Sequence, residues 1–95
     1  MKLKEYNREM NIKKFAKEQQ WEEIKMVQDN LYRFERDDFT VDIWIGKKGT
    51  TIGVHHEEIS CFLKEVSEDD IVEVLVDPDY LKKNNLGKVS KRWRK

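Results

Sequence analysis

The chain has 95 residues, of which 38% are hydrophobic, and 19 Lys and Arg residues balance 19 Asp and Glu residues. This length predicts one domain, and the zero net charge excludes a uniformly basic or acidic surface. The longest apolar runs are far shorter than the roughly 20 residues of a membrane span, so we expect a soluble, cytoplasmic protein. The only cysteine, Cys61, excludes an internal disulfide and agrees with a reducing compartment.

The first predicted element is a helix that begins after Asn11, its N-cap, and ends near Trp21. Its buried face carries Ile12, Phe15 and neighbours at helical spacing. The spacing over residues 1–10 is also helical, but a continuous helix would place those apolar residues on the side opposite Ile12. Residues 1–10 are therefore either separated by a break, or they give the helix a second apolar face for a partner.

Alternation of apolar and polar residues then predicts an antiparallel meander. Its four strands are expected at residues 31–36, 39–45, 50–56 and 59–66. In the register that the short turns set, Val41 faces Phe34 on one side and Val54 on the other, so the apolar residues share a face. The same register pairs Arg33 with Asp42 and His55 with Ser60 on the opposite face. A further strand is predicted at about residues 22–28. A two-residue turn would direct its Ile24 to the wrong face, and one more loop residue would correct this.

The C-terminal half begins with a predicted helix after Ser67. A capping residue with acids in the first turn favours a helix, although the β-branched run at residues 71–76 is also compatible with a strand. Asp77-Pro78 then begins a short helical turn that ends by Gly87. Residues 88–95 are predicted to be a frayed basic tail.

These elements predict an α+β fold. A four- to five-stranded antiparallel meander carries the N-terminal helix and the C-terminal helix on one face. Residues 1–10 are an extension or the start of the first helix, residues 11–87 form the single domain, and residues 88–95 form the tail.

Candidates for catalysis are few. The segment His55-His56-Glu57-Glu58 concentrates metal-ligand types, but adjacent strand residues point to opposite faces, so the two histidines cannot share a metal without a bulge. Cys61 falls on the apolar face, and the turn at residues 46–51 lacks the spacing of a phosphate loop. We expect no cofactor and no enzymatic activity, with a small metal-dependent hydrolase at these histidines as the enzyme alternative.

Large apolar side chains are predicted on the sheet face opposite the core. Trp44 is placed beside Leu31, and Phe62 lies over Gly53. Ordinary aromatic cover of the sheet explains this arrangement. The alternative is a platform for a protein, a second copy of the chain or stacked bases.

The end of the chain from Lys82 onward is basic, lacks acids and contains Trp93. Such a mixture is typical of contacts with a phosphate backbone and an unstacked base. The alternatives are a solvated tail, or one that folds back on the acidic stretch at residues 57–79. The predicted nucleic-acid-binding residues are Lys88, Lys91, Arg92, Trp93, Arg94 and Lys95, with Lys47 and Lys48 in a hairpin turn.

Four short stretches of the second half form a pattern of hairpin, capped helix, Asp-Pro step and Gly-Lys tail. They are Thr50-Thr51-Ile52-Gly53-Val54-His55-His56, Val66-Ser67-Glu68-Asp69-Asp70-Ile71-Val72-Glu73, Asp77-Pro78 and Leu86-Gly87-Lys88. The pattern resembles a family of small, functionally uncharacterised proteins of phages and large DNA viruses. The strand before the helix, residues 60–65, departs from that family's basic composition. The resemblance implies an α+β fold and a mobile-element origin, and it implies no activity.

The sequence thus predicts a small binding protein without catalysis, directed to nucleic acid or a ribonucleoprotein through its basic tail. The alternative is an inhibitor or adaptor of phage type, acting on a host or defence protein. A homodimer is a further expectation, and no membrane partner is expected. The residues of the protein-directed alternative are Leu31, Trp44 and Phe62, or the acidic Glu68, Asp69 and Asp70.

Overall fold

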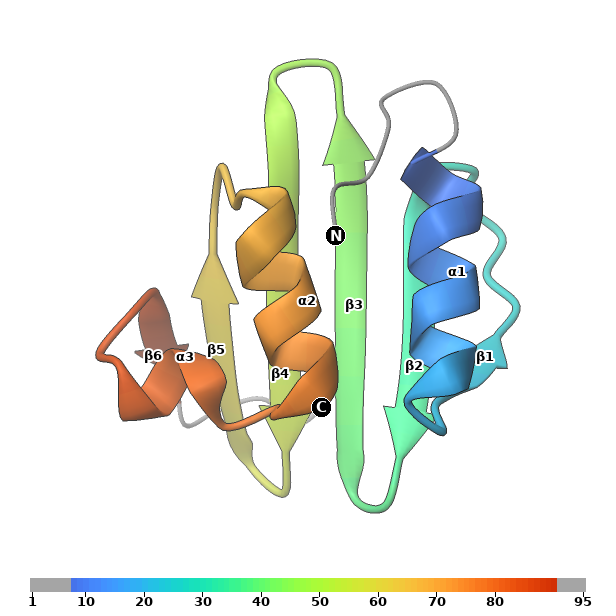
Figure 1. Ribbon diagram of the computed structural model, residues 1–95. Coiled ribbons are helices and arrows are strands. Elements are labelled where there is room, and N and C mark those ends of the chain that lie inside the picture. Colours follow the sequence, from blue (N-terminus) through green and yellow to red (C-terminus); the bar gives the residue numbers. More distant parts are fainter. Residues whose placement is uncertain (1–7, 91–95) are drawn as a thin grey trace.

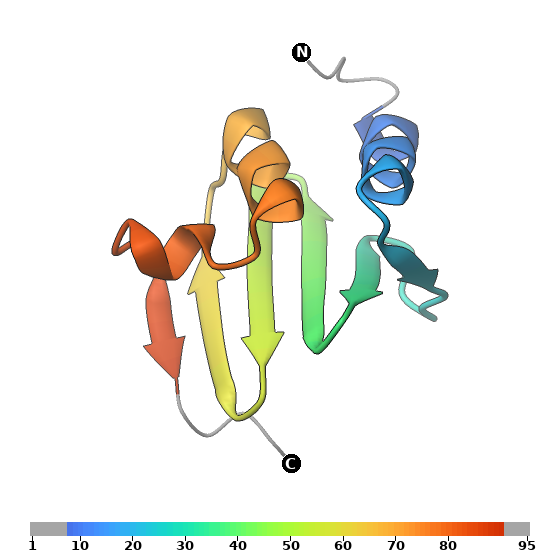
Figure 2. The ribbon, with the colours of Figure 1, turned by 60° about the horizontal axis from the view of Figure 1, so that its bottom comes forward.

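We describe residues 8–90 in a computed structural model, with side chains over residues 11–89. Six strands form one antiparallel meander in the order of the sequence, and α1 and α2 cover the same face of it (Figures 1 and 2). This confirms the α+β fold, with more strands than predicted. The elements are α1 (Arg8–Glu18), β1 (Glu22–Ile24), β2 (Leu31–Arg36), β3 (Phe39–Gly46), β4 (Gly49–His56), β5 (Ile59–Leu63), α2 (Glu68–Val76), α3 (Tyr80–Lys83) and β6 (Lys88–Ser90).

The register of the four central strands is the predicted one. Val41 pairs with Phe34 of β2 and with Val54 of β4, and Val54 pairs with Cys61 of β5. Short turns fix this register, and the period of two in a strand then sends all four side chains to the face that the helices cover. We call this the inner face and the opposite side the outer face.

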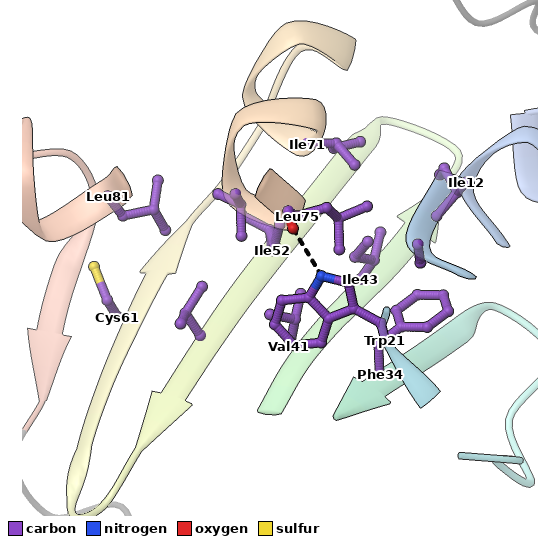
Figure 3. Close-up of a cluster of buried hydrophobic side chains, with 13 residues drawn as sticks. Ile12, Trp21, Phe34, Val41, Ile43, Ile52, Cys61, Ile71, Leu75 and Leu81 are labelled. Atoms are coloured by element: carbon purple, nitrogen blue, oxygen red, sulfur yellow. Dashed lines mark hydrogen bonds between the residues drawn. The ribbon is translucent and has the colours of Figure 1, made fainter. Parts of the chain in front are cut away.

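The core lies between the inner face and the helices. Ile12 and Ala16 of α1 and Ile71 and Leu75 of α2 are almost completely buried against the sheet (Figure 3). No helix within residues 8–90 is long and apolar enough to cross a lipid bilayer.

The β-branched run at residues 71–76 is helical, as its cap favours. The Asp70 backbone N–H donates to Ser67 Oγ at 3.1 Å, and the Ser67 N–H donates to the Asp70 carboxylate at 3.3 Å. This reciprocal pair satisfies two groups at the beginning of α2 that no helical carbonyl can reach. The local cap therefore outweighs the strand preference of Val and Ile.

Helix α1 differs from its prediction at both ends. It is already helical at Arg8, so Asn11 lies inside it and is not its N-cap, and there is no break between these residues. It ends at Glu18, before Trp21, because Gln20 adopts a left-handed backbone with φ of 73°. The predictions for residues 1–7 lie outside the described residues.

Strand β1 is shorter than the predicted strand at residues 22–28, and its register differs. Residues 25–30 form a longer connection, and Ile24 pairs with Arg33, so it lies on the outer face. Glu23 is aligned with Phe34 instead. Trp21, which is 4% exposed, supplies the buried apolar side chain at this edge of the core. The predicted correction by one extra loop residue is therefore wrong.

The prediction of a frayed segment directly after Gly87 is also wrong. Lys88–Ser90 is not frayed but forms β6, which pairs with β5. Gly87 makes this docking possible, because its φ is 75° and any Cβ there would collide with the Phe62 carbonyl. Strand β5 ends at Leu63, earlier than predicted, and Glu65 follows with φ of 55°.

Two side chains join the helices to the sheet edge. Trp21 Nε1 donates to the Leu75 carbonyl at 2.7 Å (Figure 3), and Arg36 donates to the Gln19 carbonyl at 2.7 Å and to the Val76 carbonyl at 3.3 Å. The Arg36 guanidinium also lies 4.5 Å from the centre of the Trp21 ring. Helix α2 has no basic residue in its last turn, so Arg36 supplies from β2 the cation that a helix C-terminus favours.

Candidate functional site

The outer face carries a row of five side-chain positions across five strands. Arg33, Asp42, Gly53, Phe62 and Lys88 are successive partners from β2 to β6. Strand β6 thus places Lys88, predicted to lie in a free tail, beside Phe62 of the predicted aromatic platform. The structure therefore brings residues of the two rival sequence hypotheses onto one surface.

Two half-buried aromatic rings lie on this face. The rings of Trp44 and Phe62 are 6.4 Å apart between centroids and tilted by 39°. The Phe62 ring lies over Gly53, where an added Cβ would come within 2.8 Å of ring carbon Cε1. Gly53 therefore lets Phe62 lie against the strand, where its ring also meets the His55 ring at 5.4 Å between centroids. Leu31 is only 6% exposed, so it supports Trp44 and does not itself offer a contact surface.

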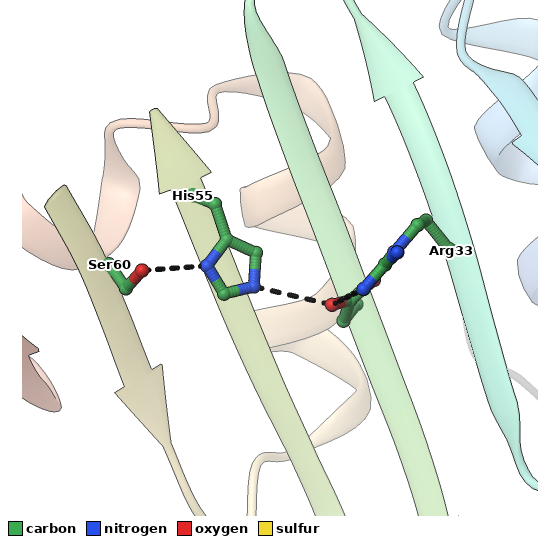
Figure 4. Close-up of polar contacts among 4 residues, drawn as sticks. Arg33, His55 and Ser60 are labelled. Carbon is green, nitrogen blue, oxygen red and sulfur yellow. Dashed lines mark hydrogen bonds and ion pairs between the residues drawn. The ribbon is translucent and has the colours of Figure 1, made fainter. Parts of the chain in front are cut away.

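A polar network crosses the same face (Figure 4). Arg33 donates to both carboxylate oxygens of Asp42, at 2.6 and 2.8 Å. His55 bridges the strands, with Nε2 3.2 Å from Asp42 Oδ2 and Nδ1 2.7 Å from Ser60 Oγ. Burial of Asp42 favours its protonated form, but the hydrogen bonds from Arg33 and His55 outweigh burial, and the pKa of Asp42 lies below its ordinary value.

The grouping of Asp42, His55 and Ser60 has the residue types of a hydrolase triad but not its accessibility. Ser60 is fully buried and Asp42 is 1% exposed, so a substrate cannot reach the hydroxyl in this conformation. Arg33 also holds the carboxylate in a bidentate pair. In this geometry the network joins β2, β3, β4 and β5, and it keeps a negative charge below the surface.

The other candidates for chemistry are separated by the fold. His56 lies on the opposite side of β4 from His55 and stacks on Phe39 at 4.1 Å between centroids. Cys61 is buried, its thiol donates to the Leu86 carbonyl, and burial raises the pKa of the thiol. Within residues 8–90, no three His, Cys, Asp or Glu side chains are grouped to hold a metal ion.

Lysines gather at the end of the sheet beside Trp44. A hollow of about 400 Å³ there is lined by Lys47, Lys48 and Lys64, together with Thr51 and Glu65. Thr51 pairs with Trp44, so this hollow adjoins the aromatic rings. Sequence reasoning missed Lys64. Continuing the pairing of Ile52 with Leu63 by one residue would have placed Lys64 beside Thr51, on the outer face.

The predicted acidic surface lies elsewhere. Glu68, Asp69 and Asp70 form the first turn of α2, in the layer on the inner face. Asp70 also accepts a hydrogen bond from the Tyr80 hydroxyl at 3.2 Å. The acidic residues therefore do not form one surface with Trp44 and Phe62. The predicted contact residues Lys91, Arg92, Trp93, Arg94 and Lys95 lie outside the described part of the chain.

Comparisons with protein-family models, with curated proteins and with solved structures find no match to this chain. The resemblance to small phage and viral proteins therefore stays a prediction. The case for a function rests on the chemistry of the outer face.

Proposed function

We propose that this protein binds single-stranded nucleic acid on the outer face of its sheet. The observation that carries the proposal is that two half-buried aromatic rings, Trp44 and Phe62, lie on the same face as a group of lysines. Bases stack on aromatic rings, and lysines contact phosphates, whatever the sequence of the strand. The lysines are Lys47, Lys48 and Lys64 around the hollow and Lys88 in β6.

The position of the two rings favours single-stranded over duplex nucleic acid. Trp44 and Phe62 lie against the sheet and not at the tip of a loop, so a base must leave its duplex partner to stack on them. The Asp42 carboxylate should repel a phosphate little, because it is buried and paired with Arg33. Glu65 lines the hollow, but Lys47, Lys48 and Lys64 outnumber it there. Glu35 lies in β2, two residues from Arg33 and away from the lysine end of the sheet. The nucleic acid should therefore bind near the turn between β3 and β4.

The test is fluorescence anisotropy with labelled oligo-dT and oligo-U of about 12 nucleotides. Lys47→Glu combined with Lys48→Glu should weaken binding at least about tenfold. The slope of log affinity against log salt should become shallower by about 1.4, because each phosphate contact of a single strand contributes about 0.7. Phe62→Leu and Trp44→Ala should each weaken binding about five- to tenfold at constant salt, since stacking is lost.

The matched control is the double reversal Lys14→Glu with Lys17→Glu in α1, on the opposite layer, which should leave oligonucleotide affinity unchanged. Equal losses in this control and in the hairpin variant would show general charge attraction and contradict the proposal. Binding that is absent, or that does not respond to salt, would contradict it too.

The predicted role of the chain end is tested separately. Truncation after Ser90 removes four cations and Trp93. If these residues extend the interface, the truncated chain should bind the same oligonucleotides several-fold more weakly but keep its dependence on Phe62. Binding that vanishes completely on truncation, with no effect of Phe62→Leu in the full chain, would move the site away from the sheet face.

A further inference from the structure

A second hollow, of about 550 Å³, lies between α1 and β1 at the first edge of the sheet. Its floor is apolar, because it is formed by Trp21 and Phe34, two core residues that are 4% and 1% exposed. The α1 rim carries three lysines and the β1 rim two glutamates. We call this hollow the α1–β1 groove, and its lining residues are Lys13, Lys14, Lys17, Trp21, Glu22, Glu23 and Phe34.

The charges of the groove leave an excess of cations. Lys13 forms an ion pair with Glu23 at 3.4 Å and lies 5.3 Å from the centre of the Tyr32 ring. Lys14 and Lys17 are exposed, lie one turn apart on the same helix, and form no ion pair among the described residues. They oppose Glu22 alone, so the rim formed by α1 attracts carboxylates.

The groove also runs along an open strand edge. The Ile45 N–H donates to the Asn30 carbonyl at 2.9 Å, so alternate backbone groups of β2 bond to β3 and the intervening ones face β1. Arg33 and Glu35 are two of the β2 residues whose backbone groups face β1, where their partners are Ile24 and Glu22. The backbone N–H and C=O of Glu23 therefore point away from β2. Within residues 8–90, no strand occupies that side of β1.

We propose that the α1–β1 groove binds an extended, acidic segment of a partner protein. One aliphatic or aromatic side chain of the segment enters above Trp21 and Phe34. Carboxylates two residues before and two residues after it share its face of the strand and contact Lys14 and Lys17, and the backbone pairs with Glu23 as an added edge strand. This surface is distinct from the outer face and does not depend on the nucleic-acid proposal.

A peptide fits the groove better than a nucleic acid does. The floor offers no free aromatic face for stacking, because Arg36 covers the Trp21 ring at 4.5 Å. Glu22 and Glu23 on the opposite rim repel a continuous phosphate backbone, whereas a peptide can place its charges on one side only. The hollow of about 550 Å³ has room for a side chain of Leu or Phe size.

The probe is the acetylated and amidated peptide Glu-Thr-Leu-Thr-Glu, titrated into the full chain labelled with ¹⁵N; in an extended strand its two Glu side chains share the face of Leu. Amide resonances of residues 13–23 should shift, and so should the Trp21 indole N–H, whose bond to Leu75 gives it a defined position. Lys14→Glu with Lys17→Glu should weaken peptide binding at least about tenfold. Lys47→Glu with Lys48→Glu, the variant that weakens oligonucleotide binding, should leave it unchanged.

A second peptide, Glu-Thr-Gly-Thr-Glu, has the same charges but no side chain to enter the groove, and it should bind at least about tenfold more weakly. Equal binding of the two peptides would show that surface charge alone attracts them, and it would overturn the proposal. Millimolar Leu peptide without shifts in residues 13–23 would also overturn it. Oligo-dT that shifts those resonances, and loses affinity with the Lys14 and Lys17 reversal, would assign the groove to nucleic acid instead.

Discussion

Asp42 shows how a charged residue can occupy the middle of a sheet. Its carboxylate is 2% exposed, and Arg33 and His55 provide hydrogen bonds from both neighbouring strands. The sequence register correctly paired Arg33 with Asp42 and His55 with Ser60. It did not predict the bond between Asp42 and His55, because that bond runs diagonally between rows and depends on the rotamers of both side chains.

The pH dependence of stability should reveal this carboxylate. The pKa of Asp42 in the folded protein lies below its ordinary value of 3.8. The Asp42 pair therefore contributes stability that is complete above about pH 4 and is lost as the pH falls through the folded pKa. At neutral pH, Asp42→Asn should be less stable by about 2–4 kcal/mol, and this difference should shrink in acid.

Thermal unfolding of both proteins between about pH 7 and pH 2 measures the effect. The comparison cancels the titration of the other acids, which both chains share. A difference that stays constant throughout this range would show that Asp42 is not held ionised by its partners.

At the scale of elements, the predictions succeeded where the apolar pattern is long and failed where it is short. Strands β2 to β5 have enough residues to show alternation, and their register was predictable from the turns. Strand β6 has only three residues, Lys88–Ser90, and no periodicity can be read from so few. Its pairing depends on the path of the chain after α3, which is a tertiary property.

Gly87 should be the residue on which β6 depends. Gly87→Ala adds a Cβ that meets the Phe62 carbonyl, at a φ of 75° that L-residues rarely adopt. We expect a loss of about 2–4 kcal/mol in the free energy of unfolding, or detachment of β6 at a similar cost. Hydrogen exchange of the β5 and β6 amides distinguishes the two, because detachment exposes only this edge.

Asn85→Gly is the matched control. Asn85 also has a left-handed backbone, with φ of 56°, so glycine there should leave stability unchanged or slightly higher. If Gly87→Ala were as stable as the original chain, with normal protection of β6, the close approach to Phe62 would not matter.

At the scale of the whole molecule, Arg36 connects parts of the chain that the sheet alone does not hold together. It contacts the carbonyls that follow α1 and end α2, and it stacks on Trp21. Arg36→Ala should lower the free energy of unfolding by about 2–3 kcal/mol. Arg36→Lys should recover only part of this loss, because an ammonium cannot donate to both carbonyls as the planar guanidinium does.

Urea unfolding of the three proteins measures these differences. Full recovery in Arg36→Lys would mean that charge at the end of α2 suffices. No loss in Arg36→Ala would mean that the helices are held by apolar packing alone.

The fold class was predictable for the whole molecule, but the candidate surfaces were predictable only in part. Lys47, Lys48, Trp44 and Phe62 were singled out from turn chemistry and strand parity. The α1–β1 groove was not, because it combines a helix flank with a strand whose register differs from the one expected for Ile24. A cavity between elements depends on their relative placement, which no local pattern encodes.

The sequential order of the strands also bears on how the chain acquires its structure. From β1 to β5 each strand pairs with the next after a short connection, so each of these pairings closes only a short loop, and its entropy cost is small. The pairing of β5 with β6 instead closes over the longer segment at residues 64–87. The sheet from β2 to β4 can assemble while the later residues are still being added at the ribosome. The bond from Trp21 to Leu75 spans 54 residues, and it must wait until α2 has been synthesised. Closure of the helical layer is thus a late step in folding, and the hairpins from β2 to β4 form before it.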